Sequence, residues 1–411
     1  MRLARRAFLA SMMGAAAGPA VLRLGRADMP QVTLKLHHFF SSVSGAHEKF
    51  LAPWARKVEA QSGGRIRIDI FPSMQLGGAP AQLIDQARDG VADIVWAEPG
   101  STPGRFAKIE TFELPFLPSR RALVNSKALE DFASANLRDE FRELHPICFS
   151  CRDRGVVHAY RAIRSIADLR GVRLHVPNRL AGETVRALGA QGLSVPIPQL
   201  PMALSGHAIE GCLVPWDAVP ALRLSDILKQ HTDFAESALC TSTFVLAMNK
   251  PAYDRLPRDL QSVIDDNAGL DAAGMAGAMW DAEARTVTDM VRERGDPITM
   301  VSADEVARWR QATEPVVVLW LRQMKERKVN GGKLIASVHE LIGKYASEPE
   351  QETPQAVQPQ PPEQKVVTEP PSPEPPRASA EFTRPKADMP AAPTPAPVVK
   401  RRVPKELDIP L

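Results

Sequence analysis

Histidines are the residues of this sequence whose grouping comes nearest to a metal site. His37, His38 and His47 form its one local histidine cluster, and no pair of carboxylates stands beside them at ligand spacing. Because adjacent residues of a strand point to opposite faces, His37 and His38 would not converge on one ion. We therefore expect one buried histidine and one near the mouth of a cleft, and no metal or other cofactor. A metal-dependent enzyme built on these histidines is kept as an alternative.

Four cysteines raise the question of redox chemistry. Cys148 and Cys151 have redox-motif spacing, but their segment looks extended, and thiols at positions i and i+3 of a strand diverge. We interpret them as small core residues. A bridge between Cys212 and Cys240 is left open, because spacing alone does not decide pairing in an exported chain.

Motifs of nucleotide-binding loops, nucleophile elbows and zinc proteases do not occur in the sequence. What remains is a set of polar and aromatic residues at predicted strand ends, where open α/β sheets bind ligands. Trp96 ends one such strand, and Trp216 and Asp217 follow another. An indole offers a ligand a flat wall and one N–H donor. Ordinary core packing is the alternative for both tryptophans.

Cationic side chains gather on and after the predicted strand 172–176. Arg173 and His175 share the face opposite the three apolar residues of that strand. Arg179 follows in the loop before the next helix, where a guanidinium can pair with a ligand carboxylate. A solvated surface arginine is the alternative there.

Hydrophobic periodicity alternates between the periods of strands and helices. Strands are predicted at 32–36, 66–70 and 91–96, with helices between them, which indicates a parallel sheet covered by helices. The pattern restarts after Val156, where Ser165 and Asp168 form a capping box ahead of strands at 172–176, near 195 and at 209–214.

The remaining elements join these two units. A strand is predicted at 243–248, and Pro257 opens a helical stretch to about Glu293, long enough to run along both. Ser302 caps a further helix, which Pro315 is expected to kink or split. The fold class is therefore a two-lobed α/β protein. Its predicted parts are lobe 1 at 28–153 with a return at about 243–256, lobe 2 at 154–242, and the long and C-terminal helices at 257–346.

Both ends of the chain differ from this core. Residues 1–27 have a charged start, an apolar run too short to span a bilayer, and small residues, which predicts an export signal to the periplasm. Arg5 and Arg6 resemble a twin-arginine signal, with Sec export as the alternative. Removing the five arginines of this segment takes the formal charge from +3 to −2, so a basic nucleic-acid-binding surface is not indicated.

Residues 347–411 hold 17 of the 37 prolines and almost no aromatics. Such a composition predicts a disordered, partly polyproline tail. It is either a plain solvated extension or a contact for an envelope partner. The second reading supports an alternative function, in which a ligand-sensing or interaction protein uses this tail to reach its partner.

Several segments resemble the DctP family of solute-binding proteins of TRAP (tripartite ATP-independent periplasmic) transporters. In the first lobe they are 50–59 (FLAPWARKVE), 71–78 (FPSMQLGG), 89–96 (DGVADIVW), 99–106 (PGSTPGRF) and 112–116 (FELPF). In the second half they include 168–176 (DLRGVRLHV), 186–190 (RALGA), 215–217 (PWD) and 244–250 (FVLAMNK). Their order and spacing cover about residues 31–345.

This resemblance implies a receptor rather than an enzyme. Two lobes would close over a small organic ligand, usually an acid, and pass it to a permease of two membrane subunits. His175 stands where the family commonly has a carboxylate-binding arginine, so either Arg179 or Arg154 replaces that arginine or the ligand is not a simple carboxylate. The predicted ligand-binding residues are Trp96, Arg154, His175, Arg179, Trp216, Asp217 and His38.

Overall fold

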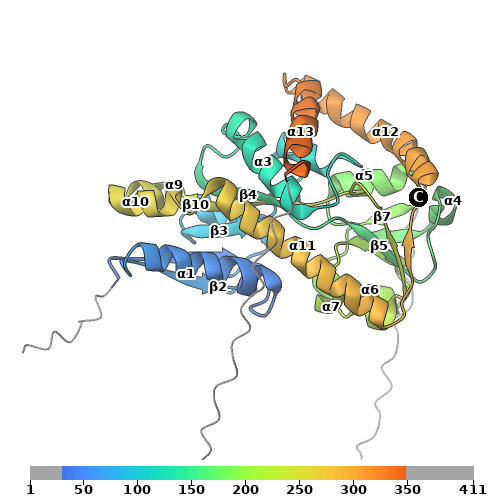
Figure 1. Ribbon diagram of the computed structural model, residues 1–411, viewed down its shortest axis with the longest axis horizontal. Helices are drawn as coiled ribbons and strands as arrows, with labels where there is room; N and C mark the ends of the chain where they lie inside the picture. Colours follow the sequence, from blue (N-terminus) through green and yellow to red (C-terminus); the bar gives the residue numbers. More distant parts are fainter. Residues whose placement is uncertain (1–29, 349–411) are drawn as a thin grey trace, which may run out of the picture. The chain divides into compact units, whose positions relative to one another are not determined.

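Two mixed β-sheets with surrounding helices make up residues 30–348, the part of the chain that the computed structural model describes (Figure 1). The predicted export signal at 1–27 and the predicted proline-rich tail fall outside this range, apart from Ser347 and Glu348. None of the helices within it is long and apolar enough to cross a membrane.

The first sheet has the strand order β2-β1-β3-β10-β4. Its strands are β1 (Val32–His38), β2 (Ile66–Phe71), β3 (Ile94–Ala97), β4 (Leu144–Cys151) and β10 (Thr243–Asn249). Strand β1 pairs in parallel with β2 and β3, while β10 runs antiparallel to β3 and β4. The β-α-β pattern of the sequence therefore predicted the parallel part of this sheet correctly, and β10 is inserted from a distant part of the chain.

Helices cover both faces of the first sheet. They include the π-helix η1 (Ala46–Leu51), α1 (Ala52–Gln61), α2 (Leu83–Arg88), the 3₁₀-helix η4 (Ile109–Glu113) and α3 (Ala122–Asn136). Alternate residues of β3 enter different cores, with Val95 on one side and Trp96 on the other. Cys148 and Cys151 of β4 likewise lie in different cores, so their thiols point to opposite faces of the sheet, as predicted.

The second sheet has the order β11-β9-β5-β8-β6-β7. Its strands are β5 (Val156–Ala159), β6 (Arg173–His175), β7 (Gln191–Leu193), β8 (Gly211–Val214), β9 (Gln230–Asp233) and β11 (Ile298–Met300). Around it lie α4 (Ile166–Leu169), α5 (Arg179–Ala187), α6 (Leu200–Ser205), α7 (Ala218–Ala221) and α8 (Leu224–Ile227). The Ser165 and Asp168 capping box begins α4 as predicted.

Two long helices are shared by the cores of both sheets (Figure 1). Helix α11 (Gly269–Glu293) packs Trp280 with the first sheet and Val287 with the second. Helix α12 (Ala303–Glu326) does the reverse, placing Trp309 with the second sheet and Trp320 with the first. The remaining helices are α9 (Lys250–Asp254), α10 (Arg258–Asp265) and α13 (Gly331–Ala346).

One helix prediction needs correction, and one of the two outcomes predicted for Pro315 does not occur. The stretch from Pro257 is not continuous, because α10 ends at Asp265 and α11 begins at Gly269. The break serves the core, since the carbonyl of Asn267 accepts a 2.8 Å hydrogen bond from the indole of Trp54. Pro315 does not split α12. Pro315 and Gln311 are both exposed, so the carbonyl that loses its N–H partner can be hydrated.

Candidate functional site

Polar residues follow two strands, one in each sheet, at their carboxyl ends. Strand β4 ends at Cys151 and is followed by Arg152, Asp153 and Arg154 before β5 begins. Strand β8 ends at Val214, just before Trp216 and Asp217. These are carboxyl ends of strands, the edge at which open α/β sheets bind ligands.

Arg152 joins the two sheets through Asp217. Its Nε donates to Asp217 Oδ1 at 3.1 Å, and its Nη2 donates to Asp217 Oδ2. Their side chains are 17% and 12% exposed, so water can reach the pair only in part. Burial acts against the charged guanidinium, but Asp217, Glu98 and Asp153 together outweigh burial and raise the pKa of Arg152 above its usual value.

Five aromatic side chains lie beside this ion pair and are called here the aromatic cluster: Phe39, Phe40, Trp96, Phe244 and Trp280. The guanidinium carbon of Arg152 lies 5.3 Å from the ring centroid of Phe40 and 5.1 Å from that of Trp280. Both distances are within cation–π range. Trp96 stacks on Trp280 with centroids 5.8 Å apart.

The cluster has a buried part and an accessible part. Trp96, Phe244 and Trp280 are fully buried, whereas Phe39 and Phe40 are only half-buried and stack at 4.3 Å. The indole N–H groups of Trp96 and Trp280 have no hydrogen-bond partner within residues 30–348. Buried donors of this kind are uncommon in folded proteins.

Arg154, by contrast, has carboxylates on both sides of its guanidinium. Its Nε and Nη2 donate to Asp233 at 2.8 and 2.6 Å, and its Nη1 donates to Asp153 at 2.9 Å. All three side chains are buried. Burial, partly offset by Arg154, raises the pKa of Asp153 to about 7. This arrangement fixes the crossing between β4 and β5.

Arg179 is the first residue of α5, and its Nη2 donates to Glu110 Oε2 of η4 at 2.6 Å. This ion pair links a helix beside the second sheet to a helix beside the first. The Arg179 side chain is 26% exposed. It borders a hollow of about 290 Å³ whose other walls are Pro103, Gly104, Ala107 and Glu110, together with Gln323, Glu326 and Arg327. Arg179 therefore faces α12 at this hollow.

The predicted histidines are buried and neutral. His175 Nδ1 accepts a 3.3 Å hydrogen bond from the Val195 backbone, so its proton sits on Nε2, which has no partner in the described residues. Burial lowers the pKa of His175 to about 4. His38 Nε2 lies 3.1 Å from His47 Nδ1, and burial, assisted by His47 and His37, lowers the pKa of His38 to about 3.

Trp216 is fully buried and packs against two histidines. Its ring centroid lies 5.2 Å from that of His158 and 5.4 Å from that of His231, and its own backbone N–H donates to Asp153 at 3.4 Å. It lies in the core between the second sheet and α11. Its indole N–H also lacks a partner among residues 30–348.

Of the seven predicted residues, Asp217 and Trp96 lie near Arg152. Asp217 forms an ion pair with Arg152, and Trp96 belongs to the aromatic cluster that packs against it. Arg154 and Trp216 meet at Asp153, while His38, His175 and Arg179 have separate partners. Sequence reasoning missed Arg152, Phe40 and Trp280. Arg152 and Phe40 each follow the end of a strand, which was an available signal; Trp280 offered none.

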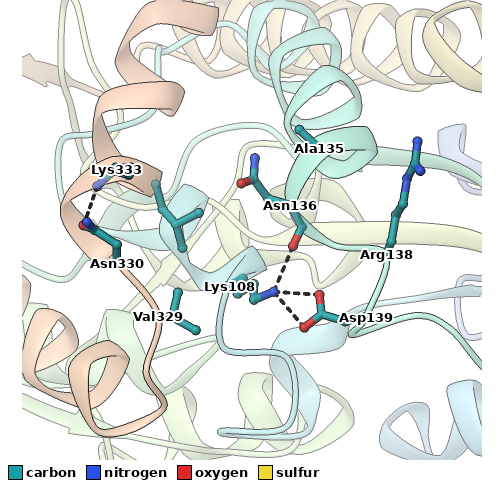
Figure 2. A pocket seen from close by; sticks show the side chains of 9 residues that line it. Lys108, Ala135, Asn136, Arg138, Asp139, Val329, Asn330 and Lys333 are labelled. Atoms are coloured by element: carbon teal, nitrogen blue, oxygen red, sulfur yellow. Dashed lines mark hydrogen bonds and ion pairs between the residues drawn. The ribbon is translucent and has the colours of Figure 1, made fainter.

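A second hollow, of about 380 Å³, lies between the end of α3 and the start of α13 (Figure 2). Lys108 Nζ donates there to the Asp139 carboxylate at 2.6 and 2.7 Å and to the Asn136 carbonyl at 3.2 Å. Its charge is thus already neutralised. Residues 30–348 contain no cluster of histidine, cysteine and carboxylate side chains that could hold a metal ion, and all four cysteines are free thiols.

Comparison with known proteins identifies a family. The family model DctP, "Bacterial extracellular solute-binding protein, family 7", matches residues 37–323. A TRAP solute-binding protein from Rhodoferax ferrireducens, solved with copurified benzoate, is 36% identical with a TM-score of 0.73, over 76% of this chain and 98% of that chain.

Two further proteins are similar. A marine metagenome TRAP solute-binding protein specific for aromatic acids, solved with 3-hydroxybenzoate, is 36% identical with a TM-score of 0.74, over 77% of this chain and 99% of that chain. The outer membrane transporter protein TsaT of Comamonas testosteroni is 22% identical over 306 residues, which cover 73% of this chain and 88% of that protein.

Proposed function

Because the chain belongs to the DctP family of bacterial extracellular solute-binding proteins, we propose that it captures a small organic acid in the periplasm and delivers it to a TRAP-type permease. Members of this family bind solutes and are not enzymes, and the same holds for this chain. Its partners are a small organic ligand and the membrane subunits of the transporter.

The observation that carries this proposal is the ion pair of Arg152 and Asp217 beside the aromatic cluster. Arg152 follows a strand of the first sheet and Asp217 follows a strand of the second, so a solute held beside this ion pair lies where the two lobes meet. Such a solute stabilises the closed arrangement to the extent that it contacts both lobes only there. Trp96 and Asp217 belong to the proposed site directly.

The other predicted residues have different parts in the proposal. We propose that the connection between β4 and β5, which Arg154 stabilises through Asp233, acts as a hinge between the lobes. The ion pair of Arg179 with Glu110 is a second link between the lobes. His38, His175 and Trp216 each place one unpartnered nitrogen in buried surroundings, and we propose that they contribute polar walls. Export by the twin-arginine route and a partner for the proline-rich tail remain predictions, because they depend on residues outside 30–348.

Thermal unfolding in the presence of a library of organic acids tests the proposal. A ligand at 100 times its Kd stabilises the native state by about 2.7 kcal/mol and raises the Tm. We expect at least one acid to do so, while neutral sugars of similar size do not. Absence of a shift with every acid would contradict the receptor function, as would unchanged acid uptake in cells that lack this chain but keep the permease.

A further inference from the structure

One edge of the Arg152 guanidinium has no hydrogen-bond partner among the residues that the structure describes. A guanidinium carries five N–H donors, and within residues 30–348 the hydrogen bonds of the Arg152 side chain use only Nε and one donor of Nη2, both to Asp217. The two donors of Nη1 and the second donor of Nη2 remain. The second donor of Nη2 and the Nη1 donor beside it form the outer edge of the guanidinium, which can hold a carboxylate by two parallel hydrogen bonds, while the other Nη1 donor points back along the side chain.

Neither of the other two arginines offers the same combination. Arg154 has carboxylates on both edges, from Asp233 and from Asp153. Arg179 has unused donors, but it borders the hollow beside α12, where the lining residues include no aromatic ring. Arg152 is therefore the arginine at these strand ends with a free bidentate edge next to aromatic faces.

The aromatic cluster supplies a surface for a flat ring. Phe39 and Phe40 stack on each other with planes 26° apart and remain half-buried, so they can contact a ligand. Trp96, Phe244 and Trp280 are fully buried, and each packs against the ring of Phe40 on its core side. Aromatic pairs at centroid distances of about 4.5–7 Å contribute attraction beyond the burial of apolar area, which an aliphatic ring lacks.

The charges near Arg152 limit the ligand to one carboxylate. Asp217 already balances the guanidinium, and Glu98 and Asp153 also lie close enough to affect it. One free edge accommodates one carboxylate. A second carboxylate on the same ring would be desolvated without a cation of its own, next to acidic side chains.

We propose that the ligand is an aromatic monocarboxylate whose carboxylate accepts two hydrogen bonds from the outer edge of Arg152 while its ring packs on Phe39 and Phe40. Asp217 is a positioning residue, because it occupies the opposite edge and fixes the plane of the guanidinium. This inference depends on the proposed function and adds the chemical class of the ligand and the group that binds its charge.

Calorimetric titration of the purified protein with four matched probes tests the inference. Benzoate has both features, cyclohexanecarboxylate keeps the charge without the aromatic ring, benzamide keeps the ring without the charge, and phthalate adds a second carboxylate. We expect benzoate to bind at least about 10-fold more tightly than each of the other three. A 10-fold difference in Kd corresponds to about 1.4 kcal/mol, which is the contribution of a single good contact.

Variants assign the roles of the residues. Arg152→Gln should weaken benzoate binding at least about 30-fold. The double variant Arg152→Gln, Asp217→Asn should lose as much, and it leaves no unpaired carboxylate to disturb folding. Phe40→Leu should reduce the preference for benzoate over cyclohexanecarboxylate, whereas Arg179→Gln should leave that preference unchanged.

The outcomes separate this inference from the proposed function. If no organic acid binds the wild-type protein, the receptor function itself fails. If acids bind but the aliphatic acid equals benzoate, or if both Arg152 variants keep wild-type affinity for benzoate, the receptor function stands and the inference is wrong.

Discussion

Helix α11 touches α3 so closely at Gly277 that a single added methyl group should destabilise the protein. A Cβ built on Gly277 would lie 2.6 Å from the Leu123 Cα, 2.8 Å from the Ala122 carbonyl oxygen and 2.9 Å from the Leu123 nitrogen. The closest of these is about 0.8 Å short of the 3.4 Å at which ordinary contact begins. All three atoms belong to the backbone, so the helices must separate.

The cost can be estimated from three contributions. Overpacking of this kind costs about 1–3 kcal/mol. Separation also stretches the hydrogen bonds by which the Ala122 and Leu123 N–H groups donate to Asp281 at 2.8 and 3.0 Å, which are worth about 1 kcal/mol or more each. Against this, alanine gains about 1 kcal/mol over glycine inside a helix. We expect Gly277→Ala to lower the free energy of unfolding by about 2 kcal/mol.

Gly274 provides a matched control in the same helix. The nearest atom to a Cβ built there is the Lys127 Cε at 3.8 Å, an ordinary contact. Gly274→Ala should therefore raise the free energy of unfolding by up to about 1 kcal/mol. Urea unfolding of the ligand-free proteins at one pH measures both changes. If Gly277→Ala is as stable as Gly274→Ala, the close approach of α11 and α3 is wrong.

Two buried groups should make stability depend on pH in opposite directions. Burial lowers the pKa of His231 to about 4 from 6.5, so the unfolded chain takes up a proton first and stability is lost as the pH falls below 6.5, by about 2 kcal/mol at pH 5. His231→Asn should reduce this loss in urea unfolding at pH 7.5 and 5, and an unchanged loss would exclude His231 as its source. Burial raises the pKa of Glu113 to about 8 from 4.5, so the native state keeps a proton that the unfolded chain releases, and stability falls by about 2.5 kcal/mol from pH 5 to pH 7. Glu113→Gln should remove that fall; a variant with the same slope as the wild type would show that Glu113 is not buried and protonated.

The parallel part of the fold was predictable because its signals are local. The strands at 32–36 and 66–70 were expected from apolar residues at alternate positions and the strand at 91–96 from an apolar run; the structure has β1 and β2 there, and β3 begins at Ile94. The break before Gly269 was not predictable, because it depends on Trp54, more than two hundred residues away, donating to the Asn267 carbonyl. The continuity of α12 through Pro315 depends likewise on which face of the helix is exposed.

The candidate site was predictable only in part, for a similar reason. Asp217 and Trp96 stood out as a polar and an aromatic residue at strand ends. The three arginines look equivalent in sequence, and their differences come from partners that folding brings to them. Arg154 meets Asp233 and Arg179 meets Glu110, both far away along the chain, which leaves Arg152 beside Phe40 and Trp280.

The position of a bound ligand tests the central claim most directly. In crystals grown with 3-bromobenzoate, the anomalous scattering of bromine would give a peak that marks the position of the ligand. We predict one strong peak next to Phe40, with the carboxylate on the outer edge of Arg152. The claim would be contradicted by a peak in the hollow that Arg179 borders, or in the hollow that Lys108 borders, with no peak at the aromatic cluster.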